Sequence, residues 1–256
     1  MINNKAYVAF HQGWTDIVCQ LPIINFYSKH YDEIKIFFRE DSKELVNFYI
    51  KGLKNVYPIY VKTNNGSNLF EYFNTNSLFL DYDILFHGQY EVYRKDKIKA
   101  IQGKYFFIEE FYRSYGIEYN NRVDCFEFIR DEILENKKYE DFINQYGNNY
   151  VIYHDDPNNH LYGIHHKSTK INFDIILKDH EYVNLNQKSN IFFDYIKIIK
   201  NAKEIHLVDS IWAALIYQID AKYSLFSEKQ INLYPKRGHV EMFNSPKKLK
   251  NWKIIL

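Results

Sequence analysis

Short apolar runs of strand length alternate with helix-length segments along most of the chain, and this alternation restricts the fold more than any other feature of the sequence. In the first half the strand-length runs are residues 5–11, 34–38, 56–61 and 82–87. Between them, residues 16–30 and 42–51 have the pattern of helices, with Ile17, Leu21, Ile24 and Tyr27 at helical spacing in the first. Strands that alternate with helices favour parallel βαβ units over a β-sandwich.

A second series of the same kind follows a long helical stretch. Residues 105–146 are helical in pattern, and their predicted buried side chains are Phe107, Phe111, Phe126, Ile129, Ile133 and Phe142. The pattern stops near Gly147, and new strands are predicted at 150–154, 182–185, 204–208 and 231–234, with helices at 191–201 and 211–219. We therefore expect an α/β fold of two Rossmann-like domains, residues 1–147 and 148–256.

Charge and cysteine content exclude several classes of function. The 33 Lys and Arg residues against 32 Asp and Glu give a formal net charge of +1, which offers no general electrostatic reason for a nucleic-acid partner. The first residues lack the basic and apolar regions of a signal peptide, and no apolar stretch reaches the ~18 residues of a transmembrane segment. The two cysteines form no C-x-x-C pair, so we expect a reduced, cytoplasmic protein.

Polar residues follow several of the predicted strands. Ligands of open α/β sheets bind outside the carboxyl ends of the strands, so these positions are the first candidates for a site. They are residues 11–16, 87–88, 154–159 and 209–210. Because both halves of the chain supply such ends, we expect the two domains to face a common cleft.

Asp16 stands at the start of a predicted helix, three residues after Gly13. In one interpretation Asp16 or Thr15 caps the helix by accepting a bond from a first-turn N–H group. In the other, Asp16 is a general base, and Gly13 lets a substrate approach the backbone. The positive end of the helix would keep the carboxylate ionised. The residues alone leave both interpretations open.

Asp209 and Ser210 open the apolar helix predicted at 211–219. They either cap it, or the helix N-terminus holds the diphosphate of a nucleotide, because unpaired N–H groups and the helix dipole both favour anions. The sequence contains no G-x-G-x-x-G or Walker motif, so a helix N-terminus is its best phosphate candidate. The basic residues considered for neutralising a diphosphate are Lys167, Lys188, Lys236 and Arg237.

His154, Asp155 and Asp156 come nearest to a metal-binding motif. Adjacent side chains of an extended segment point to opposite sides, so Asp155 and Asp156 do not converge on one ion. We therefore expect no metal site, and no cofactor besides the substrates.

The opening HQGWTDIVCQLPIINFYSKHYDEIKIFF resembles the start of the ADP-heptose:lipopolysaccharide heptosyltransferase-like group, where a Gly-x-Gly-Asp turn leads into an apolar helix with a proline. Gly13, Asp16 and Pro22 keep these places, and Thr15 replaces the second glycine. NNYVIYHDDP and NIFFDYIKIIKNAKEIHLVDSIWAALIYQIDA resemble the first strand and the donor segment of that family's second domain. The ending LYPKRGHVEMFNSPKKLKNWKII is similar to divergent glycosyltransferases of viruses and low-GC bacteria.

The resemblance implies a GT-B fold and a metal-independent, inverting glycosyltransferase of glycan biosynthesis. Such an enzyme moves a sugar from a nucleotide-sugar donor to a hydroxyl of a glycan or glycoconjugate acceptor. The resemblance also implies that Asp16 is the catalytic base. The donor-side candidates are His154, Asp155, Asn158, Lys188, Asp209, Ser210 and Arg237. The acceptor-side candidates are His11, Gly13, Trp14 and His87.

Two other functions remain open. After Asp209 and Ser210 the family continues with glycine and then histidine, whereas this chain continues with Ile-Trp-Ala-Ala. That departure favours a catalytically degenerate protein that binds a glycan or a nucleotide without turnover. A sugar-nucleotide epimerase of the same architecture is the second alternative.

Overall fold

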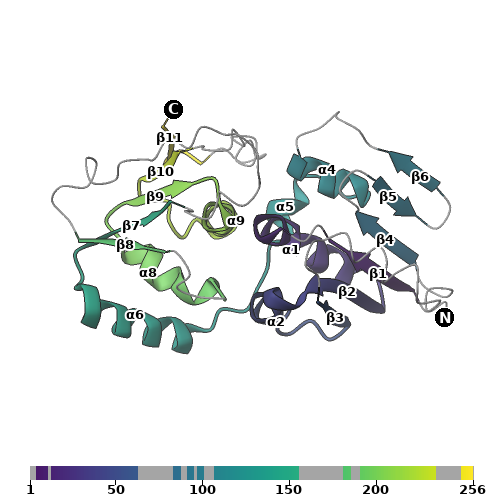
Figure 1. The fold of residues 1–256 in the computed structure, drawn as a ribbon, viewed down its shortest axis with the longest axis horizontal. Helices are drawn as coiled ribbons and strands as arrows, with labels where there is room; N and C mark the ends of the chain where they lie inside the picture. Colours follow the sequence, from purple (N-terminus) through teal and green to yellow (C-terminus); the bar gives the residue numbers. More distant parts are fainter. Residues whose placement is uncertain are drawn as a thin grey trace. The chain divides into compact units, whose positions relative to one another are not determined.

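The computed structural model describes residues 4–10, 13–62, 83–87, 91–94, 97–100, 107–155, 181–185, 191–234 and 249–255. The chain divides into two compact units, Met1–Ile129 and Arg130–Leu256, each with its own sheet (Figure 1).

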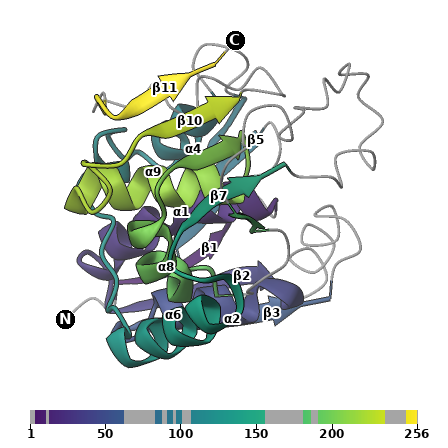
Figure 2. The same ribbon diagram turned by 90° about the vertical axis from the view of Figure 1, so that its left-hand side faces the viewer.

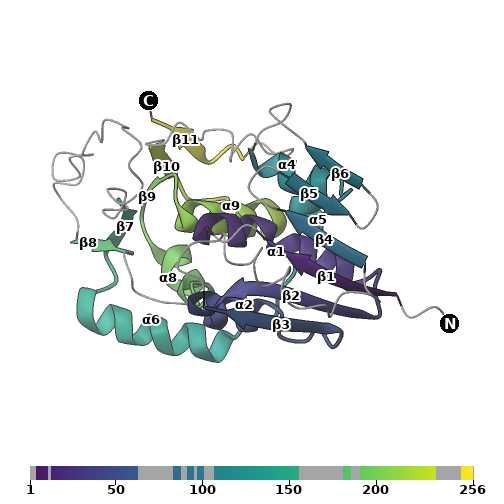
Figure 3. The same ribbon diagram turned by 45° about the vertical axis from the view of Figure 1, so that its right-hand side comes forward.

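The sheet of the first unit has the strand order β3-β2-β1-β4-β5-β6 (Figure 3). Its parallel strands are β1 (Lys5–Ala9), β2 (Glu33–Arg39), β3 (Val56–Val61) and β4 (Asp83–His87). All four were expected from the sequence. β5 (Glu91–Arg94) and β6 (Lys97–Ala100) extend the sheet in antiparallel fashion and were not expected.

Helix α1 (Trp14–Ser28) is the central helix of this unit. The four residues predicted to form its apolar face, Ile17, Leu21, Ile24 and Tyr27, are each at most 5% exposed. Burial goes well beyond one face, because every residue from 17 to 25 is buried. The other helices among the described residues of the unit are η1 (Glu40–Ser42), α2 (Lys43–Tyr49), α4 (Phe107–Ser114) and α5 (Asn121–Asp124).

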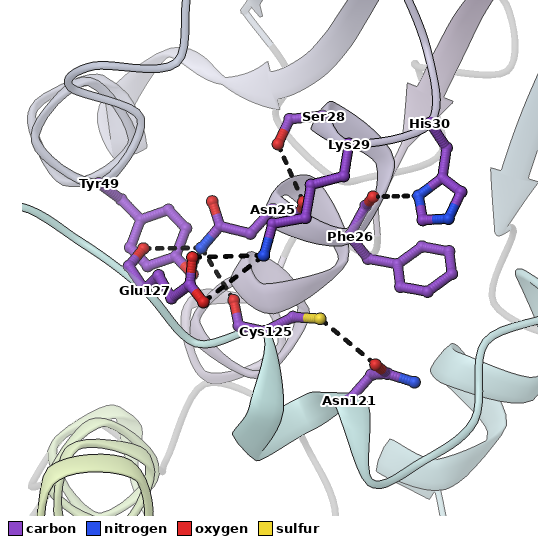
Figure 4. Close-up of polar contacts among 9 residues, drawn as sticks. All are labelled: Asn25, Phe26, Ser28, Lys29, His30, Tyr49, Asn121, Cys125 and Glu127. Carbon is purple, nitrogen blue, oxygen red and sulfur yellow. Dashed lines mark hydrogen bonds and ion pairs between the residues drawn. The ribbon is translucent and has the colours of Figure 1, made fainter.

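Asn25 joins α1 to two other segments of the unit (Figure 4). Its side-chain Nδ2 lies 2.8 Å from the hydroxyl of Tyr49 at the end of α2. The same nitrogen lies 2.9 Å from the carbonyl oxygen of Cys125 and 2.6 Å from that of Glu127. A buried polar side chain is stabilising only when it is hydrogen-bonded, and here one amide binds three acceptors. Asn25 thus holds the segment after α5 against the last turn of α1.

The sheet of the second unit has the order β11-β10-β9-β7-β8, and its strands pair in parallel. The strands are β7 (Tyr150–His154), β8 (Glu181–Asn184), β9 (Ile205–Val208), β10 (Ile231–Tyr234) and β11 (Trp252–Ile254). Sequence analysis predicted the first four and missed β11. The helices in the part of this unit that the structure describes are α6 (Glu132–Tyr146), η3 (Phe193–Tyr195), α8 (Ile196–Asn201) and α9 (Ile211–Tyr223).

Helix α6 belongs to the second unit, so the division at residues 129 and 130 falls earlier than the expected boundary at 147 and 148. The Phe142 ring of α6 packs against the Tyr150 ring of β7, with centroids 4.7 Å apart. Lys197 of α8 donates to the Asn136 side chain over 2.7 Å, and the two helices lie side by side (Figure 2). These contacts explain why α6 goes with the second sheet.

Two of the residues predicted to be buried are exposed. Ile129 is 53% exposed and Ile133 is 84% exposed, so these two predictions were wrong. On α6 the buried residues are Glu135 and Phe142. Ile133 precedes Glu135 by two positions, about 200° around the helix, and therefore lies on the opposite side. Phe111, Phe126 and Phe142 are buried as predicted, and nothing is described of the Phe107 side chain.

Asp220, 1% exposed in the last turns of α9, connects that helix to the edge strand β11. Its Oδ1 accepts from the backbone N–H of Phe226 at 2.9 Å. Its Oδ2 accepts from Nδ2 of Asn251 at 2.9 Å and from the indole Nε1 of Trp252 at 3.3 Å. Hydrogen bonds to a charged acceptor are among the stronger ones in proteins, so this carboxylate fixes β11 to the unit.

The contacts of Asn25 predict a stability difference between two nearby substitutions. Asn25→Ala should lower the free energy of unfolding by about 1–3 kcal/mol, because three buried acceptors lose their donor. Asn25→Asp should lower it further, because a carboxylate would then face two carbonyl oxygens. Denaturant unfolding followed by circular dichroism measures both.

Lys29→Ala is the matched control on the same helix. Lys29 forms a 3.4 Å ion pair with Glu127, and both side chains are about half exposed. Exposed pairs contribute roughly 0–1 kcal/mol, so this variant should remain close to the parent. Equal losses in Asn25→Ala and Lys29→Ala would contradict the role given to Asn25.

Candidate functional site

Gly13 is the N-cap of α1, with φ −65° and ψ 141°, and its carbonyl oxygen accepts from the N–H of Ile17 at 2.8 Å. The interpretation that Thr15 or Asp16 is the capping residue was therefore wrong, because both already lie inside the helix. Asp16 is the third helical residue and is half-buried. Asp16 therefore lies in the first turn, at the end of α1 where the backbone N–H groups point outward.

The backbone beneath Asp16 is held by buried groups. Gln20, fully buried one turn later, donates from Nε2 to the carbonyl oxygen of Asp16 at 2.9 Å. The Tyr112 hydroxyl of α4 donates to the carbonyl oxygen of Cys19 at 2.7 Å. Both contacts fix the first two turns of α1, which lie directly beyond the carboxyl end of β1.

Cys19 lies on the buried side of these turns. Burial raises the pKa of its thiol to about 11, while the neighbouring Arg122 guanidinium lowers it and Asp16 raises it. Arg122 is itself fully buried, and its Nη2 lies 3.7 Å from Sγ of Cys19. A thiol with such a pKa stays protonated near neutral pH, so Cys19 is not a nucleophile.

Ser210 is the N-cap of α9, directly after strand β9 and Asp209. Its side-chain oxygen accepts from the backbone N–H of Ala213 at 3.5 Å. The capping interpretation of Ser210 is thus confirmed, and a diphosphate at this helix end stays a prediction. Asp209 and Ser210 are each 2% exposed, and residues 211–214 of the first turn carry no charge.

Aromatic side chains surround the first turn of α9. The indole of Trp212 packs against the ring of Phe192, with centroids 4.8 Å apart, and against Tyr195 at 5.6 Å. Phe192 has a left-handed backbone with φ 63°, which is uncommon outside glycine and Asn. This packing fixes the position of the helix start and of the N–H groups that it presents.

The carboxyl ends of β7 and β8 lie next to each other because the strands are parallel neighbours. His154 ends β7 and is 6% exposed, and Asp155 follows it, half-buried. Asn184 ends β8 and donates from Nδ2 to Oδ1 of Asp155 at 3.2 Å. Asn184 was not among the predicted site residues. A polar residue near the carboxyl end of a predicted strand could have indicated it.

Several predicted site residues cannot be placed. His11, Asn158, Lys188 and Arg237 lie outside the described residues, as do Lys167 and Lys236. The backbone of His87 ends β4, the strand beside β1, so it lies at the same edge of the sheet as the beginning of α1. Trp14 is the first residue of α1 and is half-buried.

His206 is a buried histidine that sequence analysis did not consider. It lies within β9, 2% exposed, with Nδ1 2.9 Å from the hydroxyl of Tyr234 and Nε2 3.1 Å from a carboxylate oxygen of Glu204. Burial lowers its pKa, against the opposing effect of Glu204. It lies inside the sheet and not at a strand end, so its bond to Tyr234 joins β9 to β10, and its bond to Glu204 stays within the chain next to β9.

The described part of the chain contains neither a metal-binding cluster nor a membrane-spanning helix. No group of three or more His, Cys, Asp or Glu side chains there has the arrangement of a metal site. Across the same residues, no helix is both long enough and apolar enough to cross a membrane.

Similar proteins are found by structure and not by sequence. The sequence matches no protein-family model and no curated protein. The glycosyl transferase family 9 protein from Veillonella parvula has a similar structure, with a TM-score of 0.53 and 9% identity, over 100% of this chain and 87% of that one. The heptosyltransferase WaaC from E. coli, solved with ADP, has a TM-score of 0.48 and 9% identity, over 98% and 92%.

The fold is therefore α/β with two Rossmann-like units of the GT-B type, as expected from the sequence. At 9% identity the likeness to the family 9 protein establishes the fold alone. The function depends on the residues of this chain's own site.

The cap of α9 predicts a graded effect of substitutions at Ser210. Ser210→Ala should lower the free energy of unfolding by about 0.5–2 kcal/mol, because the Ala213 N–H loses its acceptor. Ser210→Gly should cost only a few tenths of a kcal/mol, because glycine is itself a good N-cap residue. Thermal unfolding measures both variants, and an equal loss in the two would show that the side-chain bond is not the stabilising feature.

Proposed function

We propose that this chain is an inverting glycosyltransferase that moves a sugar from a nucleotide-sugar donor to a hydroxyl of a glycan or glycoconjugate. One observation carries the proposal. Asp16 is a half-buried carboxylate in the first turn of α1, directly beyond the carboxyl end of β1. That end of a parallel sheet is where α/β proteins bind ligands, and the fold is that of a family 9 glycosyl transferase.

In the proposed reaction Asp16 is the general base. Its carboxylate takes the proton of the acceptor hydroxyl while that oxygen attacks the anomeric carbon of the donor sugar. The bond between the anomeric carbon and the diphosphate breaks on the opposite side, and the nucleoside diphosphate leaves with the electron pair. The configuration of the anomeric carbon is therefore inverted. Gly13, which has no side chain, leaves room for the acceptor beside the helix start.

The donor diphosphate is proposed to bind at the beginning of α9. Ser210 engages the N–H of Ala213, and the N–H groups of Ile211 and Trp212 belong to the same uncharged first turn. Unpaired first-turn N–H groups and the helix dipole stabilise the charge that develops on a leaving diphosphate. The packing of Trp212 against Phe192 and Tyr195 supports this assignment, because a fixed helix start loses little entropy on binding.

The remaining donor-side assignments are part of the same proposal. Asp155, His154 and Asp209 follow or end parallel strands, where they can bind the hydroxyl groups of a nucleotide sugar. Asn158, Lys188 and Arg237 are proposed from the sequence, the last two as counter-charges of the diphosphate. His11, Trp14 and His87 are the proposed acceptor-side contacts. Cys19 and Cys125 form no disulfide with each other, which accords with the cytoplasmic location that we propose.

A protein that binds a glycan or a nucleotide without turnover is the second candidate. The observation in its favour is that Ile211, Trp212, Ala213 and Ala214 replace the glycine and histidine that follow Asp-Ser in the resembled family. A sugar-nucleotide epimerase would use the same fold with a different outcome, since it changes the sugar without releasing the nucleotide.

A panel of nucleotide sugars distinguishes the three functions. The purified protein is incubated with UDP-, GDP-, ADP- and CMP-sugars, with water or an added methyl glycoside as the acceptor, and the melting temperature, the free nucleotide and the sugar configuration are measured. A transferase is stabilised by its donor and releases nucleotide, with or without EDTA because we propose that no metal takes part. Stabilisation without nucleotide release would instead identify a binding protein, and a changed sugar on an intact nucleotide would identify an epimerase.

Asp16→Asn tests the general base. Asparagine keeps the size of the side chain but cannot take up a proton near neutral pH, so nucleotide release should slow by about 10²–10⁴-fold. The melting temperature should change little, because one first-turn charge contributes about 0.3–1 kcal/mol. Glu44→Gln is the matched control, since Glu44 is an exposed first-turn carboxylate of α2. Turnover of Asp16→Asn at the level of Glu44→Gln would remove Asp16 from the mechanism.

A further inference from the structure

The ends of β1 and β2 bring an aromatic ring and an ion pair together beside Asp16. β1 and β2 are parallel neighbours, so the start of α1, which follows β1 in the chain, and the last residue of β2 lie at the same end of the sheet. Trp14 is the first residue of α1, and the Arg39 guanidinium carbon lies 5.7 Å from the centroid of its indole ring. A guanidinium at this distance from a tryptophan ring is attracted to it and restricts its orientation.

The Arg39 guanidinium also binds the carboxylate of Asp41, which restricts its position. The guanidinium binds the carboxylate in a bidentate manner, through Nε to Oδ1 and through Nη2 to Oδ2 at 2.5 Å. The local chain explains the arrangement, since Ser42 is fully buried and its hydroxyl donates to the carbonyl oxygen of Arg39 at 2.8 Å. This short turn, η1, directs Asp41 back towards the side chain two residues earlier.

These three side chains remain accessible to a ligand. The Arg39 side chain is 29% exposed, the Asp41 side chain is 51% exposed, and Trp14 is half-buried. An aromatic ring next to a fixed guanidinium and a carboxylate suits one kind of ligand, a pyranose ring. Its C–H face can stack on the indole, while its hydroxyl groups donate to the carboxylate and accept from the guanidinium.

The charges near this cluster indicate which sugar it takes. Residues 13–16 and 39–43 contain three carboxylates, Asp16, Glu40 and Asp41, against two cations, Arg39 and Lys43. Arg39 is already neutralised by Asp41, and Lys43 lies with its Nζ 5.8 Å from the ring of Tyr60. An acidic sugar would therefore meet a slightly negative surface, whereas a neutral one would not.

We propose that Trp14, Arg39 and Asp41 form an acceptor subsite that binds a neutral pyranose and discriminates against acidic sugars. The assignment of this sugar as the acceptor rests on the proposed transferase function, in which Asp16 is the base. Trp14 precedes Asp16 by two residues. That spacing is about 3 Å of rise along the helix, so a sugar on the indole lies at the end of α1 that carries the base. Trp14 contacts the sugar, and Arg39 and Asp41 bind its hydroxyl groups and position the indole.

Indole NMR signals give a direct test that needs no turnover. The chain has three tryptophans, so ¹⁵N-labelled protein gives three indole N–H signals, and Trp14→Phe identifies the one from Trp14. The probes are the methyl glycosides of glucose, galactose, mannose and N-acetylglucosamine, with methyl glucuronide as the acidic partner of the glucoside. The signals of Trp212 and Trp252, which belong to the other unit, are internal controls.

At least one neutral glycoside should shift the Trp14 signal and leave the other two in place. Methyl glucuronide should bind about fivefold more weakly than the glucoside or not at all, from one like charge near 4 Å in water. Arg39→Gln and Asp41→Asn should each weaken the best glycoside about tenfold or more. Arg113→Gln is the control, because it breaks the exposed ion pair of Arg113 with Glu109 on α4.

Three results would overturn the inference: no shift with any neutral glycoside, tighter binding of the glucuronide, or equal binding in Arg39→Gln and Arg113→Gln. The donor panel run on the same protein separates this failure from that of the proposed function. Nucleotide release without a glycoside response overturns the subsite alone. A glycoside response without nucleotide release overturns the transferase and leaves a sugar-binding site.

Discussion

Burial of α1 on nearly every side is the constraint on which the first unit depends. A helix with one apolar face tolerates polar residues elsewhere, but each residue from 17 to 25 is buried. Its polar side chains must therefore find partners inside the protein, and Gln20 and Asn25 do so. The bond of Gln20 stays within α1, whereas those of Asn25 reach other segments, so the helix cannot rotate or slide without losing the contacts of Asn25. Its first turn, which carries Asp16, is fixed beyond the end of β1 as a consequence.

Short apolar runs predicted most of the strands, because strands that are covered on both faces, such as β7 and β9, are almost uniformly apolar. β3, β7 and β10 were predicted with their observed bounds. Three short, largely polar strands were missed: Glu91–Arg94, Lys97–Ala100 and Trp252–Ile254. Each pairs with a strand that either lies far away in the sequence or was itself not predicted. Ile133 shows the opposite error, since an apolar residue at helical spacing says nothing about which side of the helix is covered.

The site could be predicted only in part for a related reason. Strand ends are local features, so Asp16, His154 and Asp209 were selected from the chain alone, and the cap at Ser210 followed from a hydroxyl before an apolar helix. Contacts between strands are not local. The bond from Asn184 to Asp155 requires that β7 and β8 be neighbours, and the contact of Arg39 with Trp14 requires the same of β1 and β2. The spacing of residues along the chain does not indicate which strands are neighbours in a sheet.

The contacts of Asp220 also bear on how the second unit is made during protein synthesis. The carboxylate emerges from the ribosome as part of α9, whereas two of its three donors belong to Asn251 and Trp252. Until those residues follow, the charge can remain solvated only if the end of α9 stays open to water. The second unit is therefore expected to close late, when its edge strand arrives. During synthesis the incomplete sheet of the second unit would therefore be accessible to chaperones and proteases for longer than that of the first unit.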